Sequence, residues 1–339
     1  MLATESAAAS SGLLSAVVGI GIVLVVVAAG LIVVRQRNGR DRQRIAVGSD
    51  LRPGESRPSA HPGARPRSRD RVRQVLPRKR AKTPPEPWLN DEVVLYGPWF
   101  STVCHGYCGP RDDSRLAVRA ATLRGLSHRY DGTPGQDVLG VVWNPRRMSL
   151  FAVVADGLGS LPESGEAARF AVQAALRTAR RLPDRANPAI ILGEAGEAVR
   201  QYNGHGEMKG TATMVVAEIR RTRSEAHVTT WGVGDSEAWL LRGGRWGALH
   251  HERRAGRENV TRHLPHDESS RTERRVPAGT VVLLATDGFA SALGSGSPLG
   301  AELAESWQRP PAPLDFLAQV DFEDDHFTDD RAAVAVWIR

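Results

Sequence analysis

Cysteine is scarce in this chain of 339 residues, which contains only Cys104 and Cys108. A structural zinc site needs four ligands. No second Cys or His pair with suitable spacing follows these two, so the sequence argues against a zinc site. In a reducing compartment two free thiols are the expected state. A chain of this length also buries enough apolar surface to fold without disulfides.

Charge is absent from one long stretch near the N-terminus. Residues 13–34 are uncharged and mostly apolar, which matches the length of a membrane-spanning helix. Only Glu5 is charged before them, so the basic region of a cleaved signal peptide is missing as well. We expect a transmembrane helix here, with a buried core helix as the alternative. Five arginines within residues 35–44 would keep the following chain in the cytoplasm and leave residues 1–12 outside, as in a single-pass cell-membrane protein.

Acidic residues are scarce in the next segment. Residues 35–82 contain 16 Lys or Arg and four acidic residues, so the net charge of +7 arises there. Global charge therefore gives no basis for a nucleic-acid partner. The Pro-, Arg-, Gly- and Ser-rich residues 35–87 are predicted to form a disordered linker that anionic lipid could attract, or a solvated linker without a partner. The remaining residues, 88–339, are predicted to form the folded domain.

Several predicted strands have an aspartate at one end. Asp156 ends a strand over 149–155, and Asp287 ends a strand that starts at Gly279. The strand-Asp-Gly pattern is also typical of an ordinary hairpin turn. Two further strands begin at an acidic residue, namely at Asp137 and at Asp329 or Asp330. Because antiparallel neighbours bring the start of one strand beside the end of the next, a hairpin should place Asp137 close to Asp156.

The order of the elements predicts an α+β fold. Amphipathic helices are expected over 163–182 and 188–202 and shorter ones over 299–307 and 313–320. Strands over 210–219, 227–235 and 237–242 suggest an antiparallel meander. Strands, helices, strands, helices and a last strand favour a layered sandwich of antiparallel sheets. The charged residues 252–275 are predicted to form a surface loop, and Asp235-Ser236 a turn near the site.

Gathered carboxylates need a cation between them, because unpaired they repel one another and are costly to desolvate. An all-oxygen site suits Mg²⁺ or Mn²⁺. Two such ions can bind a phosphate ester and lower the pKa of a bridging water, which then attacks phosphorus in line. An unrelated phosphodiesterase with the same metal chemistry is an alternative interpretation.

Six short motifs, in this order, resemble those of the metal-dependent protein phosphatases, the type 2C serine/threonine phosphatases, in a bacterial form. They are Gly125-x-Ser127-His128 leading to Gln136-Asp137, Val154-Ala155-Asp156-Gly157-x-Gly159-Ser160, Gly210-Thr211-Ala212-Thr213, Gly232-x-Gly234-Asp235-Ser236, Thr286-Asp287-Gly288 and Asp329-Asp330. The resemblance covers residues 125–339. It implies an αββα four-layer sandwich and phosphorylated proteins as substrates.

The resemblance also implies a ligand set for two Mg²⁺ or Mn²⁺ ions. Asp156 would bridge both ions and Gly157 would offer its carbonyl. Asp287 and Asp329 would complete one ion's shell. Asp156 and Asp287 would be catalytic through the metal-bound water, which would be the nucleophile. The resemblance implies three further ligands. Asp137 would act directly or through water, Asp330 is the alternative to Asp329, and Glu207 would serve a third ion.

Three positions depart from the family pattern. Gln136 stands where many members have Glu, Leu158 where many have a His proposed as the leaving-group acid, and Arg331 where Asn or Asp usually follows. These departures keep a second hypothesis open, namely a pseudophosphatase that acts as a membrane-tethered regulatory or scaffold protein. The sequence does not decide the oligomeric state.

Overall fold

The computed structural model describes residues 86–339 except 112, 114, 223, 251–260, 267–268, 295 and 323–325. The predicted N-terminal segment, transmembrane helix and linker (1–12, 13–34 and 35–87) lie outside these residues, apart from the linker's last two. Within the described part of the chain, no helix is both long and apolar enough to span a membrane.

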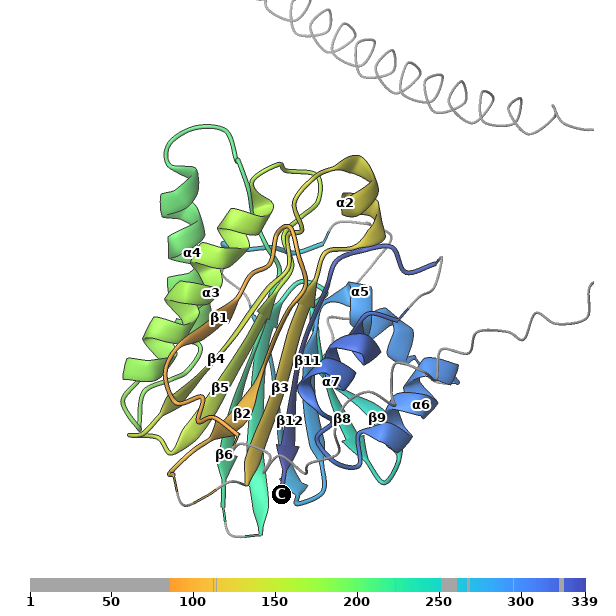
Figure 1. Cartoon of the computed structure of the whole chain (residues 1–339). Helices are drawn as coiled ribbons and strands as arrows, with labels where there is room; N and C mark the ends of the chain where they lie inside the picture. The colour runs from red at the N-terminus through yellow and green to blue at the C-terminus, as the bar shows by residue number, and fades with distance from the viewer. Residues whose placement is uncertain are drawn as a thin grey trace, which may run out of the picture. The chain divides into compact units, whose positions relative to one another are not determined.

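Two antiparallel sheets of six strands each form the centre of the described domain (Figure 1). In spatial order, the first sheet contains β1 (Val93–Leu95), β4 (Val138–Asn144), β5 (Ser149–Ala155), β6 (Met214–Arg221), β7 (Glu225–Val233) and β10 (Ser270–Pro277). The second contains β2 (Thr102–Cys108), β3 (Leu116–Leu123), β12 (Arg331–Ile338), β11 (Val281–Ala285), β8 (Glu237–Arg242) and β9 (Arg245–His250).

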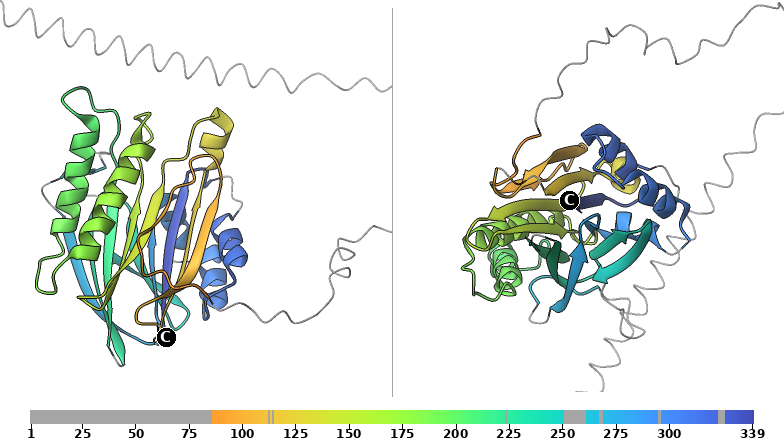
Figure 2. Two further views of the ribbon diagram at one scale, coloured as in Figure 1. Left: turned by 60° about the vertical axis from the view of Figure 1, so that its left-hand side comes forward. Right: turned by 90° about the horizontal axis from the view of Figure 1, so that it is seen from below.

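Helices cover the outer face of each sheet (Figure 2). The first sheet carries α3 (Ser164–Arg181) and α4 (Ile190–Asn203). The second carries α5 (Asp287–Ala290), the 3₁₀ turn η2 (Ser291–Leu293), α6 (Pro298–Ser306) and α7 (Pro313–Val320). The short α2 (Leu126–Asp131) lies at one end of the sandwich. The predicted α+β fold of two antiparallel sheets with helices is confirmed.

Strand β5 shows why its sequence is apolar throughout. Successive side chains of a strand point to opposite faces. Leu150 and Val154 enter the core between the sheets, whereas Phe151 and Val153 pack beneath α3 and α4. Both faces are therefore buried, and the run of apolar residues carries no alternation because neither face meets water.

The predicted meander is confirmed for its first two strands and wrong for the third. Strand β7 pairs with β6 and β10 in the first sheet, but β8 pairs with β9 and β11 in the second. The chain changes sheets at Gly234, where φ is 89° and an added Cβ would lie 2.5 Å from the carbonyl oxygen of Arg262. Glycine tolerates this backbone and this approach. The crossing carries Asp235 to the edge between the two sheets.

The predicted surface loop over 252–275 is wrong for its described end, because Ser270–Pro277 is the edge strand β10. His250, at the end of β9, is buried, and its Nε2 lies 3.1 Å from the Ser270 hydroxyl. No sequence prediction covered the elements before residue 124, where the structure has β1, β2 and β3.

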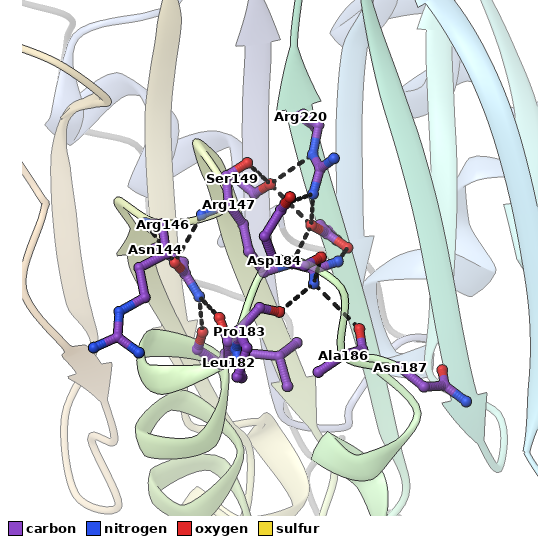
Figure 3. Close-up of polar contacts among 12 residues, drawn as sticks. Asn144, Arg146, Arg147, Ser149, Leu182, Pro183, Asp184, Ala186, Asn187 and Arg220 are labelled. Carbon is purple, nitrogen blue, oxygen red and sulfur yellow. Dashed lines mark hydrogen bonds and ion pairs between the residues drawn. The ribbon is translucent and has the colours of Figure 1, made fainter.

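A buried polar cluster holds the turn between β4 and β5 against the α3–α4 connection (Figure 3). Arg147 and Glu218 form two hydrogen bonds, from Nε to Oε1 at 2.9 Å and from Nη2 to Oε2 at 3.0 Å. Arg147 also donates to the carbonyl of Pro183 at 2.8 Å, and Asn144 donates to that of Leu182 at 2.9 Å. This cluster lies at the end of β5 opposite Asp156. There it holds the β4–β5 turn, β6 and the α3–α4 connection together.

Candidate active site

The first sheet brings two of the predicted aspartates together. Val138 of β4 pairs with Ala155 of β5. Asp137, which precedes β4, and Asp156, which follows β5, therefore lie side by side as predicted. The carbonyl of Asp156 accepts a hydrogen bond of 2.8 Å from the backbone N–H of Thr213. The hairpin and the neighbouring segment thus hold Asp156 at the rim of the sheet.

The second sheet delivers two further aspartates to the same place. Strands β11 and β12 pair in antiparallel register, so Asp287, which follows the end of β11, lies at the same edge as Asp329, which precedes β12. Thr286 links the sheets because its hydroxyl donates to Asp137 Oδ2 at 2.7 Å. The carboxylates of all four strand ends therefore meet at one end of the sandwich.

A cleft of about 580 Å³ opens at this end, and residues of α2 and α5 line it. Figure 1 labels both helices. The described residues lining it include five aspartates and neither Lys nor Arg: Ser127, His128, Asp156, Gly157, Leu158, Gly159, Thr213, Asp235, Thr261, His263, Asp287, Thr328, Asp329 and Asp330. Asp137 lies beneath this surface, 4 % exposed.

Asp235 is the functional candidate that the sequence interpretation undervalued. It offers a carboxylate oxygen that lies within 4.8 Å of oxygens of Asp156 and Asp287. Thr261 donates to Asp235 Oδ2 at 3.1 Å. In the sequence, Gly-Asp-Ser has the pattern of an ordinary turn, and only the change of sheets after β7 brings this turn to the acidic group.

Three carboxyls of the cluster, those of Asp137, Asp156 and Asp329, have raised pKa values. Burial is the main cause for Asp137, followed by the charge of Asp156, while the hydrogen bond from Thr286 acts in the opposite direction. Burial also comes first for Asp156, followed by the charges of Asp287 and Asp329. Partial burial likewise raises the pKa of Asp329. Such a site favours a bound cation, because a cation offsets both the desolvation and the mutual repulsion.

The donor set fits a hard divalent cation. Asp156, Asp235 and Asp287 offer carboxylate oxygen only, with no thiolate or imidazole in the group, and Mg²⁺ and Mn²⁺ prefer such oxygen ligands.

Asp329 and Asp330 differ sharply in their contacts. Asp330 is 3 % exposed, and its carboxylate accepts two backbone N–H bonds of 2.6 Å, from Gly125 to Oδ1 and from Gln136 to Oδ2. The Nδ1 atom of His128 lies 2.9 Å from Oδ2. Asp329 is more accessible, and its Oδ1 accepts the N–H of Asp330 at 2.8 Å. Both residues line the cleft, but the carboxylate of Asp330 ties the start of α2 to the start of β4, and Asp329 is the more exposed of the two.

Gly157 lies where no side chain fits. An added Cβ would approach the carbonyl carbon of Ser164 to 2.8 Å and Gln136 Cβ to 2.9 Å. The residue also forms an isolated bridge with Ala212. This close packing seats the loop after β5 against the start of α3, so the carboxylate of Asp156 and the loop backbone are fixed together.

The three departures from the family pattern lie in different environments. Leu158 lines the cleft. The side chain of Gln136 is buried, and its Oε1 has no hydrogen-bond partner among the described residues. Arg331 is buried and donates to the carbonyls of Val320, Phe322 and Phe327, at 3.1, 2.6 and 2.6 Å.

The structure does not bring Glu207 to the acidic group. This residue is exposed in the connection between α4 and β6 and does not line the cleft. Among the described residues, the acid that joins Asp156 and Asp287 is instead Asp235.

An acidic cleft that holds a group of three carboxylates, between the ends of two helix-covered antiparallel sheets, suits a hydrolase that works with divalent cations. A family model described as Protein phosphatase 2C matches residues 124–314, more than half of the chain, and the chain belongs to this family. Members of the family are metal-dependent serine/threonine phosphatases, so the chain is classed as an enzyme of this kind. No curated protein matches the sequence.

Solved bacterial phosphatases share the fold. The serine/threonine phosphatase Stp1 from Staphylococcus aureus is 16% identical with a TM-score of 0.52, and the match covers 69% of this chain and 98% of that one. The serine/threonine phosphatase of S. agalactiae is 14% identical with a TM-score of 0.50, over 66% of this chain and 100% of that one. A structure described as a bacterial serine phosphatase is 15% identical with a TM-score of 0.50, covering 66% of this chain and 97% of that one.

Proposed function

We propose that this protein is a membrane-anchored, metal-dependent phosphatase that hydrolyses phosphoserine and phosphothreonine on proteins. One observation carries the proposal: aspartates from both sheets converge on one cleft, where burial and the neighbouring carboxylates raise the pKa values of Asp137 and Asp156. A group of this kind is costly to maintain without a function that uses it.

Two Mg²⁺ or Mn²⁺ ions would supply Lewis-acid chemistry and lower the pKa of the attacking water. We assign them to the carboxylates of Asp156, Asp287 and Asp329 and to the carbonyl of Gly157, with Asp137 acting directly or through water. Asp235 joins this set because of its position, as a ligand or as a neighbour that holds a third ion.

The protein's own residues orient these ligands. Thr286 holds Asp137 by a hydrogen bond across the sheets. Asp330 holds the backbone at Gly125 and Gln136, and through it the start of β4. The cleft residues around them are polar enough to admit a phosphate ester, and Leu158 contributes an apolar side chain to the cleft wall.

The test is Mn²⁺-dependent release of phosphate from a phosphothreonine peptide by the full-length protein. We expect Asp156→Ala and Asp287→Ala to lower the rate at least about 100-fold, since even outer-shell changes at metal sites cost 10–100-fold. Glu207→Ala is the matched control, because it removes an exposed acid outside the cleft. Calorimetric titration of Mn²⁺ should show weakened binding in the first two variants alone. Equal activity in wild type and Asp156→Ala would refute the mechanism.

The anchor proposal rests on sequence alone. Residues 13–34 would span the membrane once with residues 1–12 outside, and the basic linker 35–87 would lie against anionic lipid. Extraction of membranes with alkaline carbonate should leave the protein in the pellet, and protease added to intact cells should leave the domain 88–339 uncut. Release into the carbonate supernatant would contradict the anchor.

A scaffold without catalysis is the second candidate, favoured by Leu158 in place of a histidine and by Gln136 in place of a glutamate. Under that hypothesis the protein binds phosphoproteins but releases no phosphate. Failure to bind Mn²⁺ even at millimolar concentration would favour it over the phosphatase.

A further inference from the structure

Exposed apolar side chains gather beside the cleft. Tyr130 and Leu126 of α2 are 92 % and 43 % exposed, and Trp99 and Phe100 of the β1–β2 turn are 56 % and 66 % exposed. We call these four residues the rim patch. Single exposed apolar residues are ordinary, but a group of four at one functional end marks an interaction site.

The two segments of the rim patch are joined. Figures 1 and 2 show the β1–β2 turn and α2 side by side at the cleft end. The guanidinium carbon of Arg124 lies 4.9 Å from the centre of the Trp99 ring, and Arg124 also donates to the carbonyl of His128 at 2.7 Å. The carbonyl of Pro98 accepts the N–H of Gly135 at 2.7 Å. The turn is therefore attached to α2 and to the loop that leads into Asp137.

Helix α2 separates the rim patch from the cleft. Residues four apart lie on the same side of a helix, so Leu126 and Tyr130 share one side. Ser127 and His128 lie on other sides of the helix and line the cleft. The helix is itself fixed, because Ser127 donates from its backbone to the Thr328 carbonyl at 3.0 Å. One rigid element thus offers polar groups to the cleft and apolar groups to the surface beside it.

We propose that the rim patch docks the segment of the phosphoprotein substrate that flanks the phosphorylated residue, and that it selects an apolar side chain there. This proposal rests on the proposed function. The position of the patch indicates what binds there. When a phosphorylated residue enters the cleft, the peptide on either side of it must cross the edge of the cleft, and α2 forms one such edge. A helix with its side chains is about 10 Å wide, so an extended chain crosses it in about three residues.

The selected side chain is therefore about three residues from the phosphoresidue. Tyr, Trp and Phe anchor interfaces well, because they bury a large area with few rotatable bonds. Arg124, stacked on Trp99, places a positive charge at the same surface for the anionic peptide.

The experiment compares three fluorescein-labelled phosphothreonine peptides on the full-length protein in detergent micelles. One has Phe three residues before the phosphothreonine, one has Phe three residues after it, and one has Ser at both positions. We expect wild type to prefer one Phe peptide over the Ser peptide at least about fivefold in kcat/KM, a modest value for one buried aromatic side chain. The variant Phe100→Ser/Tyr130→Ser should lose this preference.

The matched control is Ile190→Ser, which removes an apolar side chain of 51 % exposure at the start of α4, far from the cleft. It should keep the preference. Hydrolysis of p-nitrophenyl phosphate, which is too small to reach the rim patch, should be unchanged in every variant. Absence of this small-substrate activity from wild type would reject the proposed function, whereas a lost peptide preference with intact small-substrate activity supports the docking surface.

Fluorescence anisotropy of the same peptides measures docking even in the absence of turnover, and it should show the same fivefold preference and its loss. A wild type that binds the Phe and Ser peptides equally overturns the proposal. So does a double variant that keeps the preference. Altered self-association or vesicle binding in that variant, with peptide binding unchanged, would assign the rim patch to a second copy or to lipid and overturn it as well.

Discussion

Asp329 and Asp330 are adjacent, yet the structure gives them opposite responses to neutralisation. Asp330 accepts two backbone N–H bonds of 2.6 Å while almost fully buried. The variant Asp330→Asn keeps the shape of the side chain and one oxygen that can accept an N–H bond. Its NH2 group replaces the second oxygen and faces the remaining backbone N–H, which then has no acceptor. One hydrogen bond to a charged group is lost, at a cost of about 1.5–3 kcal/mol. For a domain of this size that lowers the melting temperature by about 3–12 °C.

Asp329→Asn should not destabilise the metal-free protein. The pKa of Asp329 is raised, so its ionised form is disfavoured in the fold, and a neutral amide removes repulsion from the neighbouring acids. The same variant loses a proposed ligand. We therefore expect its melting temperature in EDTA to equal or exceed that of wild type, while the increase produced by Mn²⁺ shrinks.

Differential scanning fluorimetry in EDTA and in Mn²⁺ measures both effects on full-length protein. Asp330→Asn should melt lower under both conditions and keep a Mn²⁺-dependent increase. The reasoning is refuted if the pattern is reversed, with Asp330→Asn melting like wild type in EDTA but insensitive to Mn²⁺. Circular dichroism confirms that each variant is folded before the comparison.

Three further perturbations follow from the same contacts. Gly157→Ala forces a methyl group against the start of α3, so we expect about 1–3 kcal/mol lower stability in urea unfolding and reduced Mn²⁺ affinity; unchanged values for both would contradict the packing argument. Arg147→Met leaves the Ser149 hydroxyl at 2.8 Å and the Arg220 guanidinium at 3.5 Å as the remaining partners of buried Glu218, so we expect a loss of about 1.5–3 kcal/mol, as for a hydrogen-bonded charged group; the double variant Arg147→Met/Glu218→Met should recover much of it, and no recovery would contradict the argument. The pKa values of Asp137 and Asp156 are raised above those of the unfolded chain, so their ionisation destabilises the fold; in EDTA the melting temperature should rise as the pH is lowered towards the ordinary aspartate pKa, and a steady fall would contradict the assignment.

Local patterns predicted the elements well. Helical periodicity predicted α3 over 163–182, and the structure has it over Ser164–Arg181. The hairpin argument predicted the Asp137–Asp156 neighbourhood, because the register of an antiparallel pair is set by two adjacent strands and their turn. These inferences need only contacts close in sequence.

Contacts distant in sequence account for what was missed. Strands β7 and β8 both have the pattern of apolar strands joined by a tight turn, and nothing local reveals that they join different sheets. Asp235 was undervalued for the same reason. The choice between Asp329 and Asp330 depends on N–H groups of Gly125 and Gln136, which are 205 and 194 residues away from Asp330. Strand β1, of three residues, is too short to produce a pattern.

The three departures from the family pattern do not weigh equally on activity. Arg331 binds three carbonyls and stacks at 3.8 Å on the Phe322 ring, so it supports the segment that leads to Asp329 without lining the cleft. Gln136 contributes its backbone N–H to Asp330, which a Glu would do equally, and its side chain also lies outside the cleft lining. Leu158 alone stands in the cleft. The case for a non-catalytic scaffold therefore rests more on Leu158, and on how a leaving alkoxide would be protonated beside it, than on Gln136.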